Sequence, residues 1–336
     1  MKIGTGLFTC QKRPDDGRSM SEIYDEMIEI GKAVDRAGLD SAWVSEHHFT
    51  DDGYLPGTMP SLSALGSVTS EIEIGTCIAL APLYDAVRLA EDGATVDLVS
   101  NGRLTLGMSI GYRDLEFEEF GIPKEERVDR TVEAVNLLKG AWTPGPIDYQ
   151  TEFHSISPDT SVTPKPSQDP HPPIVLSGGA KPAVRRAARI ANGWVAPSSI
   201  SIEGVRKRTE DIEKVREKED IEGDFQVYVI QHGFVGESRE DAWEKMKSGY
   251  LYIQRKYAEW YAGESIEELP DERVEELRDQ AIFGTPEQVI EGLEEYRDAL
   301  GGDIHFILRT YHPGVGTETM VECIERLGEE VAPHFR

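Results

Sequence analysis

The sequence predicts an α/β protein folded as a (β/α)8 TIM barrel. Short apolar runs alternate with amphipathic helical stretches along the whole chain, a pattern typical of a parallel sheet with crossover helices. Eight runs are strand candidates, and eight strands, each followed by a helix, close such a barrel. These runs cover residues 2–7, 40–45, 72–80, 103–109, 173–177, 193–196, 226–235 and 303–309. A length of 336 residues fits one barrel of this class.

The helices between these strands are marked by apolar stripes and by end signals. The first helix, which Gly38 ends, carries a stripe made of Ile23, Met27, Ile30, Val34 and Ala37. The fourth carries a predicted stripe made of Val128, Val132, Val135 and Leu138. Residues 285–288, Thr-Pro-Glu-Gln, predict a capping box with proline at the first helical position.

Two segments interrupt the alternation. Residues 143–172 contain seven prolines and little periodicity, and they precede the fifth strand. Residues 264–282 are acidic, follow an aromatic helix and precede the last strand. We interpret both as insertions that supply lids or substrate walls on the carboxyl face of the barrel. Because no linker separates them from the rest, residues 1–336 are predicted to form a single domain.

Composition limits the class of partner. The net charge is −27, from 62 acidic and 35 basic residues, and it makes nucleic acid an unsuitable partner. A solvated acidic surface explains this charge, and a halophilic source is our hypothesis for its origin. No apolar run reaches the ~20 residues that span a membrane, and no targeting signal is seen. The three cysteines, Cys10, Cys77 and Cys323, lie far apart without metal-ligand spacing. This pattern indicates a cytoplasmic protein with no metal site.

The second strand ends in an unusual group of ionisable residues. Trp43-Val44-Ser45 leads directly into Glu46, His47, His48 and Phe49. α/β enzymes place their chemistry at the carboxyl ends of strands, so this tract is a candidate active site, although a surface histidine pair would look the same. Adjacent strand side chains point to opposite faces. Only one histidine can therefore face the barrel, and we expect it to be His47.

Two further strand ends are rich in glycine. In the fourth strand, Gly107 and Gly111 flank Ser109, which would let a planar or bulky group approach the backbone; a tight strand end is the alternative. The fifth strand ends in Ser177-Gly178-Gly179, just before a helix. Backbone amides at a helix start bind anions, and the basic helix that follows favours a phosphate site over an ordinary turn. Its basic residues are Lys181, Arg185, Arg186 and Arg189.

These tracts together resemble one family. The matching runs are 38–49, 74–76, 89–91 through 102–104, 116–123, 172–174 and 283–289. In this order they are similar to the luciferase-like flavin-dependent oxidoreductases of the bacterial luciferase and alkanal monooxygenase superfamily. The resemblance covers nearly the whole chain.

The resemblance implies roles for individual residues. The catalytic group would be His47, in acid/base steps beside the flavin, together with Glu46 and His48. The cofactor-binding residues would be Cys77, Ile78, Ser109, Tyr112, Arg127, Ser177, Gly178, Gly179 and Trp194. Among them, Cys77–Ile78 matches a non-prolyl cis peptide against the flavin ring, and Trp194 falls on a strand that flanks the ring. One departure is Ile110, which stands where many members have an arginine for the flavin phosphate. Lys181, Arg127 or Arg185 are candidate substitutes.

The resemblance implies a monooxygenase, an oxidoreductase acting on paired donors with incorporation of molecular oxygen. It would use reduced FMN, supplied by a separate flavin reductase, on a small apolar aldehyde, ketone or similar substrate. The alternative within the same superfamily is hydride transfer with a deazaflavin, which the loss of arginine at Ile110 would suit. A homodimer is the implied assembly.

Two other classes of protein fit less well. A non-catalytic barrel subunit, like the partner chain of luciferase heterodimers, should lack the histidine pair that this chain keeps. A metal-dependent barrel hydrolase should carry His-x-His at the end of the first strand, where this chain has Thr5, Gly6 and Leu7.

Overall fold

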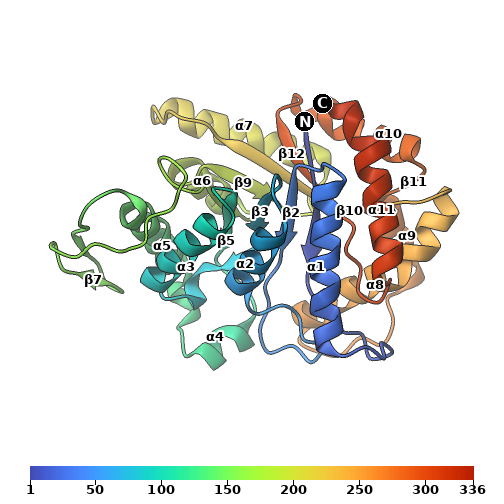
Figure 1. The fold of residues 1–336 in the computed structure, drawn as a ribbon, viewed down its shortest axis with the longest axis horizontal. Coiled ribbons are helices and arrows are strands. Elements are labelled where there is room, and N and C mark those ends of the chain that lie inside the picture. Colours follow the sequence, from blue (N-terminus) through green and yellow to red (C-terminus); the bar gives the residue numbers. More distant parts are fainter.

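The computed structural model describes residues 1–336 and forms a closed barrel of eight parallel strands (Figure 1). The strands are β1 (Lys2–Phe8), β2 (Ser41–Val44), β3 (Glu73–Thr76), β5 (Leu104–Ser109), β8 (Ile174–Ser177), β9 (Gly193–Ala196), β10 (Gln226–Val235) and β12 (Ile304–Arg309). The barrel closes where β12 pairs with β1, with Lys2 opposite His305. It is completed by the pairing of β10 with β12 and β9. The predicted (β/α)8 fold is confirmed.

Helices surround the barrel and complete the βα units (Figure 1). They are α1 (Met20–Arg36), α2 (Thr58–Val68), α3 (Ala86–Val99), α4 (Asp114–Phe120), α5 (Arg127–Trp142), α6 (Lys181–Ile190), α7 (Ile202–Lys218), α8 (Arg239–Ala262), α9 (Asp271–Gln280), α10 (Pro286–Leu300) and α11 (Thr317–Arg326). Short 3-10 or π turns lie at Ala81–Leu83, Lys124–Glu126, Leu327–Val331 and Ala332–Phe335. The predicted capping box of α10 is present, with Thr285 accepting from the Gln288 amide.

The stripe predicted for α5 is only half right. Val135 and Leu138 are buried, whereas Val128 and Val132 are partly exposed. The buried face instead runs through Thr131, Ala134 and Ala141, because α5 packs against α3 along a line rotated from the predicted one. The stripe predicted for α1 is confirmed at Ile23, Met27, Ile30 and Val34, which are all buried, but not at Ala37, which caps the helix end and is partly exposed.

Alternation along the strands divides the core into two parts. A small cluster fills the barrel interior and consists of Leu7, Trp43, Cys77, Val175, Val195, Tyr228 and Ile307. A much larger cluster of 74 residues lies between the barrel and its helices. Since successive residues of a strand face opposite sides, the residue two positions beyond an interior residue also faces inward. Ser177, after Val175, and Arg309, after Ile307, are thus placed above the interior core.

The two insertions differ in structure and position. Residues 143–172 contain the small hairpin of β6 (Tyr149–Gln150) and β7 (Ser155–Ile156), which lies at the far left in Figure 1. His154 of this hairpin bonds Glu133 of α5 at 2.7 Å, so the hairpin packs on the outside of the barrel. Residues 264–282 include α9 and lead into β11 (Ile282–Gly284), which extends the sheet beside β10.

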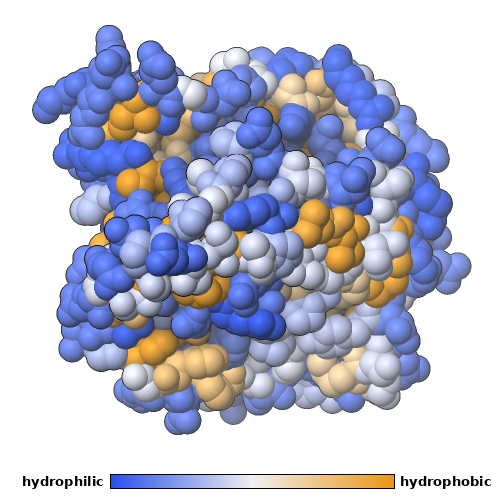
Figure 2. Space-filling view, turned by 60° about the vertical axis from the view of Figure 1, so that its left-hand side comes forward, coloured by the Kyte–Doolittle hydropathy of each residue, from blue (hydrophilic) through white to orange (hydrophobic).

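The surface is largely hydrophilic, with apolar side chains in separate patches (Figure 2). Many of its charges are paired within one helix, as in the contact of Arg206 with Glu203 at 2.8 Å. No helix combines the length and apolar character needed to cross a membrane.

Candidate active site

A cavity of about 650 Å³ opens at the carboxyl ends of the strands. Its volume lies in the range of roughly 300–1,000 Å³ that is usual for cofactor and ligand sites. Seven residues predicted for the site line it: Glu46, His47, Cys77, Ile78, Ser109, Tyr112 and Ser177. The second insertion contributes Ile266, Leu269, Pro270 and Arg273. No residue of 143–172 lines the cavity, so the interpretation of the first insertion as a lid or substrate wall is wrong.

His47 is held by a carboxylate from another βα unit. Its Nδ1 lies 2.9 Å from Oε1 of Glu116 in α4, and the same oxygen accepts from the His48 amide at 3.0 Å and from Arg113 at 3.1 Å. Burial alone would raise the pKa of Glu116, but the hydrogen bonds and charges of His47, His48 and Arg113 hold it below its usual value. An ionised Glu116 assigns the Nδ1 proton to His47 and leaves Nε2 free to accept a proton.

Aromatic rings surround the imidazole of His47. The ring centroids of Trp260 and Tyr54 lie 4.7 and 4.9 Å from it, and those of Tyr112 and Tyr257 each lie at 5.7 Å. Trp260 and Tyr257 belong to α8, the aromatic helix that precedes the second insertion. These rings limit the access of water to one side of the histidine.

The second histidine has a different environment. His48 does not line the cavity; its Nε2 bonds Glu46 Oε1 at 2.7 Å and its ring packs on Phe120 with centroids 4.9 Å apart. The other oxygen of Glu46 accepts from the Leu80 amide and the Tyr84 hydroxyl. Of the pair, only His47 lines the cavity, as expected, but both histidines lie beyond the end of β2 at Val44, and Glu46 lines the cavity too. The bond between Glu46 and His48 braces the loop.

The third strand ends against the cavity in a tightly packed backbone. The Cys77–Ile78 peptide is cis, as the resemblance implied, and a second non-prolyl cis peptide joins Gly6 to Leu7. A Cβ on Gly107 would come within 2.1 Å of the Thr76 carbonyl oxygen, so this strand contact requires glycine. Burial raises the pKa of the Cys77 thiol to about 12, which keeps it neutral. This wall is therefore smooth and uncharged.

The glycine-rich turn after β8 is open to an anion. Gly178 has φ +144, a conformation that favours glycine, and the amides of Gly179 and Ala180 donate to no group of the protein. Helix α6 starts at Lys181 without a side-chain cap. The hydroxyl of Ser177 donates to the Val195 carbonyl at 3.0 Å, which ties the turn to β9. Such free amides at a helix start can bind a phosphate.

Four residues predicted to contact the cofactor do not line the cavity: Gly178 and Gly179, which follow Ser177 in the turn, and Trp194 and Arg127. Trp194 points outward into the large core, because Val195 takes the inward position on β9, and its Nε1 donates to the Gly178 carbonyl at 3.0 Å. It supports the turn and does not flank the cavity. Arg127 donates to the Lys124 carbonyl at the start of α5 and does not line the cavity either. Lys181 and Arg185, the other candidate substitutes for an arginine at Ile110, are also absent from the lining.

The sequence did not identify Glu116, which bonds His47. It also did not identify four residues of the cavity lining, namely His232 of β10, Gln254 of α8, Arg273 of α9 and Arg309 of β12. For Arg309 a signal existed, since the run Ile304–Arg309 puts every second residue on the inward face. For Gln254 and Arg273 no signal existed, because only the packing of α8 and α9 over the barrel brings them to the cavity.

Comparisons with known proteins show the family and the fold of the chain. A model of the luciferase-like monooxygenase family matches residues 1–302. The oxygenase component of the flavin-dependent trigonelline monooxygenase of Acinetobacter baylyi is 29% identical, over 98% of this chain and 94% of its own length. The F420-dependent glucose-6-phosphate dehydrogenase of Amycolatopsis mediterranei is 24% identical, over 93% of this chain and 94% of its own length.

Solved structures share the fold over the full chain. The monooxygenase RslO1 from Streptomyces bottropensis superposes with a TM-score of 0.89 at 23% identity, and the superposition covers 100% of both chains. The oxygenating constituent of 3,6-diketocamphane monooxygenase from Pseudomonas putida, in complex with FMN, gives 0.77 at 20% identity and 99% of both chains.

Proposed function

Because the chain belongs to the luciferase-like monooxygenase family, we propose that it is a flavin-dependent monooxygenase that uses reduced FMN and dioxygen. Its substrate would be a small aldehyde, ketone or similar organic compound. The observation that carries this proposal is the buried His47–Glu116 pair, at 2.9 Å, with His47 on the wall of a cavity of about 650 Å³.

The residues around the cavity fit a flavin mononucleotide. The free amides of Gly179 and Ala180 suit a phosphate, and the smooth wall at Cys77 and Ile78 suits a flat ring. Bound in its reduced form, the flavin would supply the electrons that activate dioxygen. The aromatic side chains of α8 would then exclude water from the reacting groups, which protects reactive species from hydrolysis.

His47 would move the proton in this chemistry. With its Nδ1 proton held by Glu116, Nε2 is the basic atom and can take a proton from a substrate group or return it. Arg113 keeps Glu116 ionised from the other side and stacks over Trp260 at 4.5 Å, so the imidazole is oriented from two directions. Positioned general acid/base groups contribute typically 10²–10⁴-fold to rate.

A deazaflavin-dependent hydride transfer is the second candidate. Two observations favour it: Ile110 stands where an arginine for the flavin phosphate was expected, and an F420-dependent dehydrogenase is among the relatives. Against it stands the greater identity to a monooxygenase component.

Reduced flavin would come from a separate reductase. All eight long strands belong to the barrel, and residues 1–336 contain no second nucleotide-binding sheet for a nicotinamide cofactor. A homodimer is the proposed assembly.

Flavin titration and oxygen uptake test the two candidates. The purified protein is titrated with FMN and with F420, and oxygen uptake is then followed with photoreduced FMN and a panel of aldehydes, ketones and their carboxylated analogues. FMN binding with substrate-stimulated uptake supports the monooxygenase. Tight binding of F420 alone, or no stimulation by any compound of the panel, would contradict it.

A further inference from the structure

We propose that the substrate carries a negatively charged group, such as a carboxylate, and that Arg309 binds this group inside the cavity. The inference deepens the proposed function and rests on it for the identity of the reacting molecule. It narrows the substrate from an apolar compound to one with an apolar body and an anionic end.

Arg309 is a buried cation without a partner. It ends β12, lies between Gly6 of β1 and His232 of β10, and is 4% exposed. Its Nε and Nη2 atoms donate to no group of the protein, and it forms no ion pair. A guanidinium group stays charged at any physiological pH, and burying one without a counter-charge is costly. A ligand anion would offset this cost.

The rest of the cavity offers no anion to Arg309. Glu46 is the one carboxylate of the lining, and both of its oxygens already accept hydrogen bonds from the loop beside it. Arg273, at the rim, is paired with Glu276 at 2.8 Å. His232 is neutral, because burial together with the charge of Arg309 lowers its pKa well below the usual value. The cavity is thus cationic, although the chain carries 62 acidic and 35 basic residues.

The position of Arg309 separates it from the turn proposed for the flavin phosphate. Ser177 ends β8, and β12 is three strands further round the barrel, which is roughly 14 Å along the wall at about 4.8 Å per strand. One phosphate cannot reach both places. His47, by contrast, follows β2, only two strands from β12, or roughly 10 Å along the wall. A small molecule can therefore bind Arg309 while its reactive carbon lies near His47.

The surroundings of Arg309 suit the apolar part of such a molecule. Leu7 and Ile230 lie on the neighbouring strands, and Ile266 and Leu269 of the second insertion face them across the cavity. Gln254, whose amide lies 3.2 Å from Nε2 of His232, adds a polar group to the same cavity. A carboxylate bound here would accept charge-assisted hydrogen bonds from the two free guanidinium nitrogens.

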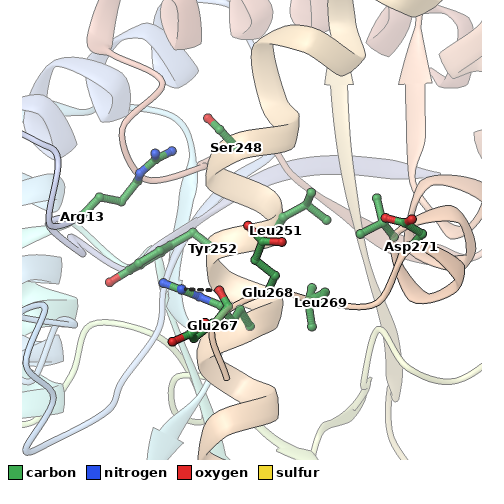
Figure 3. A pocket seen from close by; sticks show the side chains of 10 residues that line it. Arg13, Ser248, Leu251, Tyr252, Glu267, Glu268, Leu269 and Asp271 are labelled. Atoms are coloured by element: carbon green, nitrogen blue, oxygen red, sulfur yellow. Dashed lines mark hydrogen bonds between the residues drawn. The ribbon is translucent and has the colours of Figure 1, made fainter. Parts of the chain in front are cut away.

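A second pocket nearby is a poor competitor for the same anion. It has a volume of about 390 Å³ and lies on the outer side of α8, with Arg13 and Tyr252 on one side and Leu269 and Asp271 on the other (Figure 3). Arg13 is paired with Asp15 at 2.7 Å, and Arg255 donates to the Glu267 carbonyl at 2.9 Å. Its lining includes the carboxylates Glu267, Glu268 and Asp271, which repel an anion.

The test compares benzoate with benzamide, which has a similar shape and no charge. Both are titrated calorimetrically into the protein without flavin, so the result does not depend on FMN turnover. The wild type should bind benzoate about tenfold or more tightly than benzamide. Arg309→Met should lose this preference, Arg309→Lys should keep part of it, and Arg255→Met, in the second pocket, should behave as the wild type. Arg309→Met should be no less stable, because it removes an unpaired buried charge.

Two outcomes would overturn the proposal. One is equal binding of benzoate and benzamide by the wild type, or a preference that persists in Arg309→Met. The other concerns the second source of an anion, the ring of reduced flavin. If Arg309→Met weakens binding of reduced FMN tenfold while the benzoate preference remains, Arg309 serves the cofactor. If the wild type shows no substrate-stimulated oxygen uptake but still prefers benzoate to benzamide, only the proposed function is contradicted.

Discussion

The two walls of the cavity are built from different kinds of group. The wall from β2 to β8 presents one histidine and small side chains, as at His47, Ser109 and Ser177, and the free amides of Gly179 and Ala180 follow directly after Ser177. The wall from β10 and β12 presents long polar side chains, of which Arg309 has no protein partner. This contrast indicates that the first wall suits a cofactor with a flat ring and a phosphate, and that the second suits the charged end of a substrate.

The largest effect is expected from removing the imidazole of the first wall. His47→Ala should lower the turnover number by about 10²–10⁴-fold, because the proton carrier is lost. Binding of FMN should stay within about twofold of the wild-type value, since the amides of the turn are untouched. Stopped-flow turnover and FMN titration measure the two quantities.

The matched variant is His48→Ala, which changes a histidine outside the cavity. It should lower turnover far less than His47→Ala does. An equal loss of turnover in the two variants would contradict the role assigned to His47. Lost FMN binding with normal turnover in His47→Ala would contradict it as well.

Glu116 orients His47, and its removal should have the next largest effect. Glu116→Gln should lower turnover by about 10–100-fold, because the amide cannot hold the imidazole proton as strongly. The pKa of Glu116 is depressed in the folded protein. A carboxyl group of this kind stabilises the fold above its unfolded pKa, and that contribution disappears as the pH falls through the folded value.

The free energy of unfolding should therefore fall more steeply in the wild type than in Glu116→Gln as the pH drops below about 4.5, the ordinary glutamate value. Urea denaturation at a series of pH values measures this difference. If the free energy of unfolding depends on pH in the same way in both proteins, the partners of Glu116 do not stabilise its ionised form.

A cation at position 110, where the resemblance places an arginine for the flavin phosphate, should sharpen the contrast between the walls. Ile110→Arg would add a charge-assisted partner for a phosphate, and FMN should bind about tenfold more tightly. Ile110→Met provides the uncharged control and should leave the dissociation constant nearly unchanged. Weaker binding in Ile110→Arg would indicate that the phosphate does not lie beside Ser109 and Ser177.

The smallest effect is expected from changing Trp194, which lies behind the first wall and supports the turn after β8. Trp194→Phe removes the hydrogen bond to the Gly178 carbonyl and should cost about 1 kcal/mol of stability. Binding of FMN should weaken by less than about threefold, because the turn loses support but no contact. Trp142 of α5 donates an equivalent bond to the Ala90 carbonyl of α3, so Trp142→Phe should lose stability without any change in FMN binding.

Much of the fold and part of the site could be predicted because they depend on short-range patterns. The eight strands followed from the alternation of apolar runs, and the site at His47 followed from the polar tract that comes directly after the second strand. The two-residue repeat of a strand, applied to β9 and β12, would have placed Trp194 outside and Arg309 inside.

Only the tertiary structure could decide which side chains meet. Glu116 reaches His47 across 69 positions of sequence, and the second insertion covers the cavity while the first packs outside it. That Arg309 has no carboxylate beside it depends on the closure of β12 against β1 and β10, and on the packing of α8 and α9 above them. Local periodicity is set by the geometry of a few neighbouring residues, whereas pairing across a barrel is set by how distant segments pack, and no local pattern records it.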